Sequence, residues 1–318
     1  MKVLIADKFE KVGIDGIKAL GCEVISNPDL KDDALAKALG EIKPTVLVVR
    51  STKVQSSHFA ATDALKLVIR AGSGVNTIDV KAATGKGVKV ANCPGLNSTA
   101  VAELTLGLIL ALDRRIVDGV NELRKGSWNK KEYGKARGLK GRTLGVLGMG
   151  QIGRLVAKRA MAFEMSILYN DVIAAEEFDR MPNVKRVEVD ELLKKSDIVT
   201  LHVPALPETK NLMNAQRIGM MQKHAFLINT CRGDVVDEPA IVGALKEKRI
   251  AAYAADVYAN EPTNAKDTYT GPLKDLPNFI GTHHIGASTD EAQAAIAIRT
   301  VDIVKEFKNN NKVMHAVN

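Results

Sequence analysis

The sequence has few aromatic side chains, few cysteines and no long apolar run, and each shortage excludes a class of protein. Aromatic residues make up 4% of the 318 residues, so aliphatic side chains must fill the core. The three cysteines, Cys22, Cys93 and Cys231, are odd in number and lack C-x-x-C spacing, which argues against a disulfide framework and against a zinc site. The richest apolar stretch, 104–112, is much shorter than the ~20 residues of a membrane span.

The N-terminus and the charge balance indicate the cellular compartment and the kind of binding partner. Only four consecutive apolar residues, 3–6, precede Asp7, too few for a signal-peptide core. Together with the sparse cysteines, this predicts a cytoplasmic, reducing compartment and no membrane partner. The net charge is +8, but the 45 basic residues are spread along the chain among 37 acidic ones. This pattern favours a solvated surface that attracts an anionic substrate over a nucleic-acid-binding face.

Short β-branched runs alternate with amphipathic stretches through the first third of the chain. Helices are expected at 12–20 and 32–39, and strands at 3–6, 23–26, 46–49, 67–69 and 88–91. Strand–helix alternation of this kind predicts a parallel sheet covered on both faces.

A second series begins at Thr143 and offers six strands, enough for a complete doubly wound sheet. The expected strands are 143–147, 166–169, 198–201, 225–229, 251–256 and 278–281. One long helix, 98–116, would bridge the two series, and a helix at 290–309 would return to the first. The prediction is an α/β fold of two doubly wound parallel-sheet (Rossmann-like) domains with a cleft between them: a discontinuous substrate-binding domain, 1–97 plus 287–318, and a dinucleotide-binding domain, 98–286.

A glycine-rich turn lies between the first strand of the second series and its helix. Gly148, Gly150 and Gly153 form a G-x-G-x-x-G, and Asp171 follows 18 residues after the last glycine, at the end of the next strand. The glycines permit a tight turn, approach of a pyrophosphate to the backbone and close helix packing, while the aspartate accepts hydrogen bonds from a ribose. With Val172 after it, Asp171 favours NAD over NADP as the cofactor.

Three polar residues follow the ends of later strands in this series. Arg232 stands in Asn-Thr-Cys-Arg-Gly-Asp, Glu261 precedes Pro262, and His284 precedes Ile-Gly-Ala. Ligands of open α/β sheets bind beyond the carboxyl ends of strands, so we expect all three side chains beside the dinucleotide.

On these motifs, nearly the whole chain resembles the D-isomer-specific 2-hydroxyacid dehydrogenases. The resemblance implies that Arg232, Glu261 and His284 are catalytic. A guanidinium can orient the carboxylate and carbinol oxygen of a 2-hydroxy acid, and an imidazole can move the hydroxyl proton. Glu261 would fix the tautomer of His284 and stabilise its imidazolium. The family usually has proline where His283 stands, and His284 is preferred as the catalytic histidine.

The resemblance also implies further contacts to the cofactor. Besides the glycine turn and Asp171, these involve Ser73, Gln151, Ile152, Val203, Thr230, Cys231, Asp256, Gly286 and Ala287.

Within the family, the chain is most similar to the branch that oxidises 3-phospho-D-glycerate to 3-phosphohydroxypyruvate with NAD, the first step of serine biosynthesis. A basic cluster would bind the phosphate, and backbone and amide groups would hold the carboxylate end. The substrate-binding residues expected are Arg50, Ser51, Lys53, Arg70, Gly74, Val75 and Asn97.

Two other functions stay open: a glyoxylate or hydroxypyruvate reductase of the same family, and a non-catalytic NAD(H)-sensing corepressor or scaffold. The resemblance further implies a homodimer, to which Trp128 is a candidate contact. Because about thirty residues follow His284, no regulatory domain is expected.

Overall fold

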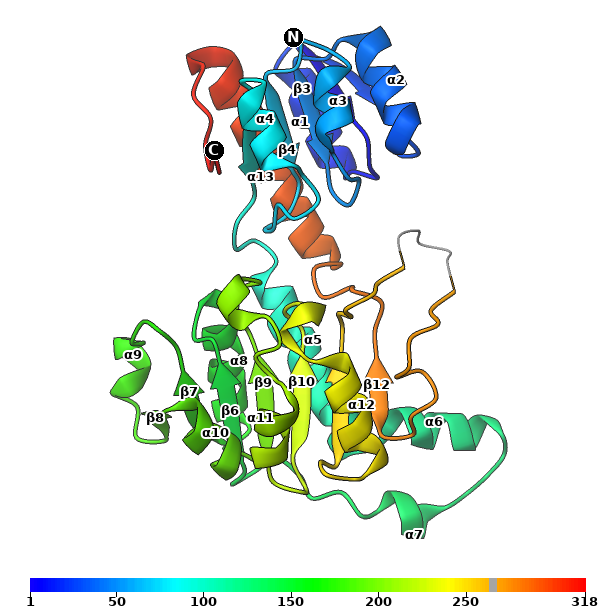
Figure 1. Cartoon of the computed structure of the whole chain (residues 1–318), viewed down its shortest axis with the longest axis vertical. Helices are drawn as coiled ribbons and strands as arrows, with labels where there is room; N and C mark the ends of the chain where they lie inside the picture. The colour runs from blue at the N-terminus through cyan, green and yellow to red at the C-terminus, as the bar shows by residue number, and fades with distance from the viewer. Residues whose placement is uncertain (263–267) are drawn as a thin grey trace. The chain divides into compact units, whose positions relative to one another are not determined.

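The computed structural model describes residues 1–262 and 268–318, which divide into two units (Figure 1). Unit 1 comprises Met1–Asn97 and Ala287–Asn318, and unit 2 comprises Ser98–Gly286. Each unit is built around its own parallel sheet.

The sheet of unit 1 has five strands in the order β2-β1-β3-β4-β5, all parallel. The strands are β1 (Lys2–Ile5), β2 (Glu23–Ser26), β3 (Val46–Val49), β4 (Leu67–Arg70) and β5 (Lys89–Asn92). All four residues of β3 are buried, as expected where helices cover both faces of a sheet.

Five helices accompany this sheet. They are α1 (Lys11–Ala19), α2 (Asp32–Ile42), α3 (Ser56–Ala60), α4 (Val80–Gly85) and α13 (Asp290–Asn310). The C-terminal helix α13 packs closely on α1. Gly16 of α1 permits this close packing, since a Cβ there would lie only 2.7 Å from the side chain of Val301 on α13. The end of the chain therefore completes the domain that its beginning forms.

The sheet of unit 2 has seven parallel strands in the order β12-β11-β10-β9-β6-β7-β8, which Figure 1 shows side by side from one edge to the other. The strands are β6 (Thr143–Leu147), β7 (Ser166–Asn170), β8 (Val184–Arg186), β9 (Ile198–Leu201), β10 (Phe226–Asn229), β11 (Ala252–Ala255) and β12 (Phe279–Gly281). The strand order reverses between β6 and β9, which is where such sheets bind nucleotides. Both sheets confirm the predicted fold class.

Two details of unit 2 differ from the sequence prediction. The sheet gains a seventh strand, β8, which has only three residues, two of them exposed and basic, and so carries almost no apolar pattern. The helix expected at 98–116 is shorter: α5 (Ser98–Asp113) ends before Arg115, whose φ of +49° is left-handed. Asp113 is tied at this end to Arg142 (2.8 Å) and to the amide of Gly138 (3.0 Å).

The other helices of unit 2 cover its sheet or follow α5. They are α6 (Ile116–Arg124), α7 (Lys130–Tyr133), α8 (Gln151–Ala162), α9 (Glu176–Asp179), α10 (Val189–Lys195), α11 (Ala215–Met220) and α12 (Glu238–Lys246), with two 3-10 turns, η1 (Pro207–Thr209) and η2 (Gly233–Val235). Among the residues that the structure describes, no helix has both the length and the apolarity to cross a membrane.

Candidate active site

The glycine-rich turn joins β6 to the first turn of α8. Gly148 has a φ of +95°, and a Cβ there would lie 2.5 Å from the carbonyl oxygen of His202, so only glycine is tolerated. A Cβ on Gly153 would collide with the carbonyl of Gly148. The absence of a side chain at Gly153 therefore lets the helix pack close to the end of the strand. Gly150 has nothing within 4 Å of the place its Cβ would take, so the approach to the N-terminus of α8 is open.

This turn fits the pyrophosphate of a dinucleotide. The first amides of the 12-residue helix α8 have no partners within the helix, and the positive end of its dipole favours an anion. Asp171 follows β7, with one carboxylate oxygen accepting from the amide of Met149 (2.6 Å) and the other from that of Ile173 (3.0 Å). The carboxylate is thereby fixed beside the turn, with lone pairs left for the hydroxyls of a ribose.

His284 and Glu261 form the central pair of the site. Nδ1 of His284 lies 2.7 Å from Oε2 of Glu261, whose other oxygen accepts from the amide of Tyr258 (3.0 Å). Burial acts to raise the pKa of Glu261, but the hydrogen bond and charge of His284, the Tyr258 amide and the charge of Arg232 together lower it. An ionised carboxylate only accepts hydrogen bonds, so Nδ1 of His284 carries a proton and Nε2 is left for proton exchange with a ligand.

Asp256 holds the loop that carries His284. It is 2% exposed, and its carboxylate accepts from the hydroxyl of Thr282 (2.6 Å) and from the amides of Ile285 (2.9 Å) and Gly286 (2.8 Å). His284 has a φ of +54°, a left-handed conformation that a non-glycine residue keeps only when its surroundings impose it. The bonds on both sides of His284 supply that constraint.

Arg232 follows β10 and immediately precedes η2. Its NH1 donates to the carbonyl oxygen of Cys231 (2.6 Å), and its own carbonyl accepts from the side-chain amide of Asn229 (2.8 Å). A Cβ on Gly233 would collide with the backbone of Tyr258, so the Arg232 loop and the segment leading to Glu261 lie in direct contact. Of the sequence-predicted residues, Arg232, Glu261 and His284 are therefore brought together.

The remaining candidates of unit 2 line or support the same end of the sheet. Burial raises the pKa of Cys231 to about 12, so its thiol stays protonated. The hydroxyl of Thr230 lies 2.9 Å from that of Thr105 on α5, which turns this side chain toward the core. A Cβ on Gly148 would lie 2.9 Å from the amide nitrogen of Val203, so Val203 borders the glycine turn. Gln151 and Ile152 are the first two residues of α8.

His202 is not a second candidate base. Its Nε2 lies 2.9 Å from the hydroxyl of Thr200, and burial lowers its pKa to about 3. The ring is therefore neutral near pH 7, in keeping with a structural role at the end of β9.

The basic candidates of unit 1 follow neighbouring strands. Val49 pairs with Arg70 in the sheet, so Arg50, one residue further on, leaves the same edge as Arg70. Arg50 donates to the hydroxyl of Ser288 (3.2 Å), and a Cβ on Gly72 would collide with the guanidinium of Arg70, which therefore lies over the loop after β4. Lys53, in the segment that follows β3, is exposed.

The other candidates of unit 1 lie in two segments. Ser73 is hydrogen-bonded to Asn97 (2.7 Å), and Gly74 and Val75 are half-buried in the loop that follows β4. Ala287 begins the segment that leads into α13, and its carbonyl accepts from the side chain of Gln293 (2.5 Å).

Two residues that sequence reasoning missed contact the predicted substrate-binding residues. Ser288 accepts from Arg50, and Asp7 accepts from the amides of Arg50, Ser51 and Thr52. Asp7 lies just beyond the carboxyl end of β1, so the strand-end rule that singled out Arg232 could have found it.

Residues 106–286 match the model of the D-isomer specific 2-hydroxyacid dehydrogenase, NAD binding domain. The chain is 40% identical over its whole length to a D-3-phosphoglycerate dehydrogenase of Methanocaldococcus jannaschii but covers only 59% of that protein. It is 41% identical to a hydroxypyruvate reductase of Thermotoga maritima, over 89% of this chain and 90% of that one. Among solved structures, the TT0316 protein of Thermus thermophilus matches at a TM-score of 0.89 and 31% identity, with both chains covered in full.

Proposed function

Because the chain belongs to the D-isomer specific 2-hydroxyacid dehydrogenase family, we propose that it oxidises a D-2-hydroxy acid with NAD, and that this acid is 3-phospho-D-glycerate. The product is then 3-phosphohydroxypyruvate, which makes this the first step of serine biosynthesis. The observation that carries the reaction class is the bond between His284 and Glu261 in the same unit as the glycine turn.

The residues of unit 2 divide the chemistry between them. Bound NAD supplies the hydride acceptor, held by the glycine turn, α8 and Asp171. Arg232 binds the carboxylate and the carbinol oxygen through its planar set of donors. Nε2 of His284 accepts the hydroxyl proton during oxidation and returns it during reduction of the keto acid. Glu261 accepts the hydrogen bond from Nδ1 and stabilises the resulting imidazolium by its negative charge.

Unit 1 supports the assignment of a phosphorylated substrate. Arg50 and Arg70 leave adjacent strands at one sheet edge, and guanidinium groups bind phosphate oxygens through paired, charge-assisted hydrogen bonds. Lys53, exposed in the segment that follows β3, adds a third positive charge. Ser51, Gly74, Val75 and Asn97 offer hydroxyl, backbone and amide groups for the other end of the substrate.

Reduction of 2-keto acids by NADH, followed at 340 nm, tests the reaction class. We expect turnover of 3-phosphohydroxypyruvate. A protein that binds NADH but reduces no 2-keto acid would instead be an NAD(H)-sensing corepressor or scaffold, the alternative that needs no catalysis.

Arg50→Ala tests the phosphate site. Loss of one charge-assisted contact is expected to raise the KM for 3-phosphohydroxypyruvate by about 10- to 100-fold, with little change in the KM for hydroxypyruvate. Arg299→Ala is a matched control, because it removes an arginine of the same unit that contacts His315. An unchanged KM in the Arg50 variant would remove this residue from substrate binding.

A hydroxypyruvate reductase is the second candidate function. It is favoured by the Thermotoga maritima relative, whose length the chain nearly spans, whereas the chain covers 59% of the Methanocaldococcus jannaschii protein. In that case Arg50 and Arg70 would not bind a substrate phosphate. The enzyme would then reduce glyoxylate or hydroxypyruvate with a kcat/KM at least equal to that for the phosphorylated acid.

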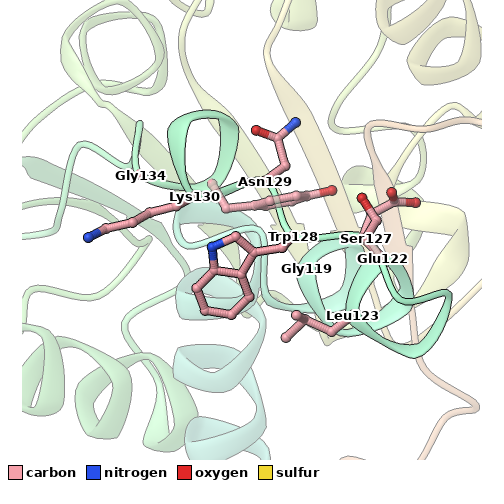
Figure 2. A pocket seen from close by; sticks show the side chains of 9 residues that line it. Gly119, Glu122, Leu123, Ser127, Trp128, Asn129, Lys130 and Gly134 are labelled. Atoms are coloured by element: carbon pink, nitrogen blue, oxygen red, sulfur yellow. The ribbon is translucent and has the colours of Figure 1, made fainter.

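A second copy of this chain is the proposed partner. No residue of α6 is buried, and its apolar side chains Ile116, Val120 and Leu123 are exposed. Trp128 is 80% exposed and, with Leu123, lines a cavity of about 260 Å³ (Figure 2). An exposed indole beside a hollow on one surface suits a two-fold interface, in which each copy offers the same patch.

Trp128→Glu is expected to convert a dimer to a monomer, because it places a charge in the apolar patch. Light scattering after size-exclusion chromatography measures the mass, and Phe163→Glu is the control at an exposed aromatic residue elsewhere in unit 2. A wild-type monomer, or a Trp128→Glu dimer, would contradict this assignment.

The state of the thiols is consistent with a cytoplasmic location. Cys22, Cys93 and Cys231 are all buried and unpaired, as is common for proteins that work in a reducing compartment.

A further inference from the structure

Asp7 anchors the loop that carries Arg50. This residue lies just beyond β1 and is 8% exposed. Its Oδ2 accepts from the amides of Arg50 (2.6 Å), Ser51 (3.2 Å) and Thr52 (3.1 Å), and its Oδ1 accepts from the hydroxyl of Ser51 (2.9 Å). Three successive amides therefore converge on one carboxylate.

This arrangement engages both oxygens of the carboxylate. Oδ2 accepts from three amides, more than its two lone-pair positions, and Oδ1 accepts from the hydroxyl of Ser51. Asp7 is therefore committed mainly to the backbone of residues 50–52. Its negative charge is also balanced locally by the amide dipoles, so that it repels an anionic ligand less than an isolated carboxylate would.

The loop in turn fixes where the guanidinium of Arg50 lies. The amide of Arg50 is held by Asp7, and its NH2 donates to the hydroxyl of Ser288 (3.2 Å). Thr52, at the other end of the turn, donates from its hydroxyl to the carbonyl of Ala6 (3.4 Å). Both ends of the loop are therefore tied to the segment that follows β1, and Arg50 projects from a rigid base.

We propose that Asp7 is a positioning residue for substrate recognition, which holds the 50–52 loop so that Arg50 meets the phosphate of the substrate. This inference rests on the proposed function. It adds a residue that contacts neither substrate nor cofactor but sets the affinity for the phosphorylated acid, because recognition of an anion by a guanidinium depends on its placement.

Three substitutions separate hydrogen bonding from charge. Asp7→Ala removes all four bonds. Asp7→Asn removes the charge but keeps an oxygen for the three amides and an NH2 that can donate to the Ser51 hydroxyl. Asp7→Glu keeps the charge but displaces the carboxylate by one methylene group. Asp15→Ala, at an exposed aspartate of the same unit, is the matched control.

Steady-state kinetics give kcat for each variant and its KM for the phosphorylated acid and for hydroxypyruvate, and fluorescence titration gives the NADH affinity. We expect Asp7→Ala and Asp7→Glu to raise the KM for the phosphorylated acid by about tenfold or more. The KM for hydroxypyruvate and the NADH affinity should stay within about twofold of wild type, and Asp7→Asn should restore most of the phosphorylated-acid affinity.

The inference is overturned if Asp7→Asn behaves like Asp7→Ala, since charge would then matter rather than hydrogen bonding, or if Asp7→Ala and Asp7→Glu keep a wild-type KM. Should Asp7→Ala fail to fold, the contrast between Asp7→Asn and Asp7→Glu decides the question. A wild-type protein with no preference for the phosphorylated acid would instead contradict the proposed function, which the comparison of the two substrates shows before any variant is made.

Discussion

Replacing His284 with glutamine is expected to lower kcat by about 10²- to 10⁴-fold, the usual contribution of a general acid–base residue. Glutamine can still form a hydrogen bond to Glu261, but it cannot take or give a proton near neutral pH. Because the glycine turn and Asp171 are untouched, the affinity for NADH should stay within about twofold. Steady-state kinetics and fluorescence titration measure the two quantities on the same preparation.

His283 provides the control for this prediction. It is the neighbouring exposed residue, and the pairing with Glu261 belongs to His284. His283→Gln should therefore keep kcat within about threefold of wild type. Near-normal turnover in His284→Gln, or an equal loss in both variants, would refute the proton-transfer role of His284.

Replacing Arg232 with alanine is expected to lower kcat/KM for the keto acid by about a thousandfold, or roughly 4 kcal/mol of transition-state stabilisation. The guanidinium is the proposed partner of both the carboxylate and the reacting oxygen, so its loss removes contacts that strengthen in the transition state. Arg232→Lys should recover only part of the activity, because an ammonium cannot present two parallel donors.

A purely structural role for Arg232 predicts a different pattern. Its NH1 donates to the carbonyl of Cys231, so the side chain could serve only to tie down its own loop. In that case Arg232→Ala would lower the melting temperature and the NADH affinity together with the activity. Unchanged melting temperature and NADH affinity, with the activity lost, support direct action on the substrate.

Much of the fold could be predicted because buried parallel strands appear in the sequence as short runs of aliphatic residues. All four residues of β3 and all four of β9 are buried, and both strands lie at the positions expected. The edge strand β8 was missed because Val184 is its single buried residue, so tertiary pairing with β7 rather than apolar pattern creates it. The break after Asp113 was missed because it depends on contacts with Gly138 and Arg142, which are remote in sequence.

The site could be predicted in part for a similar reason. The ends of parallel strands converge, so the sequence could bring Arg232, Glu261 and His284 to one region without knowledge of distances. The sequence could not show which hydrogen bonds and backbone conformations fix the loops of that region. The left-handed backbone at His284 and the three bonds of Asp256 follow from loop packing. Asp256, expected as a cofactor contact, holds the loop that carries His284.

The proposed function is tested most directly by comparing kcat/KM for 3-phosphohydroxypyruvate, hydroxypyruvate and glyoxylate, from NADH oxidation at 340 nm with the wild-type protein. The proposed phosphate site predicts a preference for the phosphorylated acid of about 100-fold or more, or about 2.7 kcal/mol of differential transition-state binding. Equal or better use of the unphosphorylated acids would contradict it and would show that Arg50 and Arg70 do not form a phosphate site.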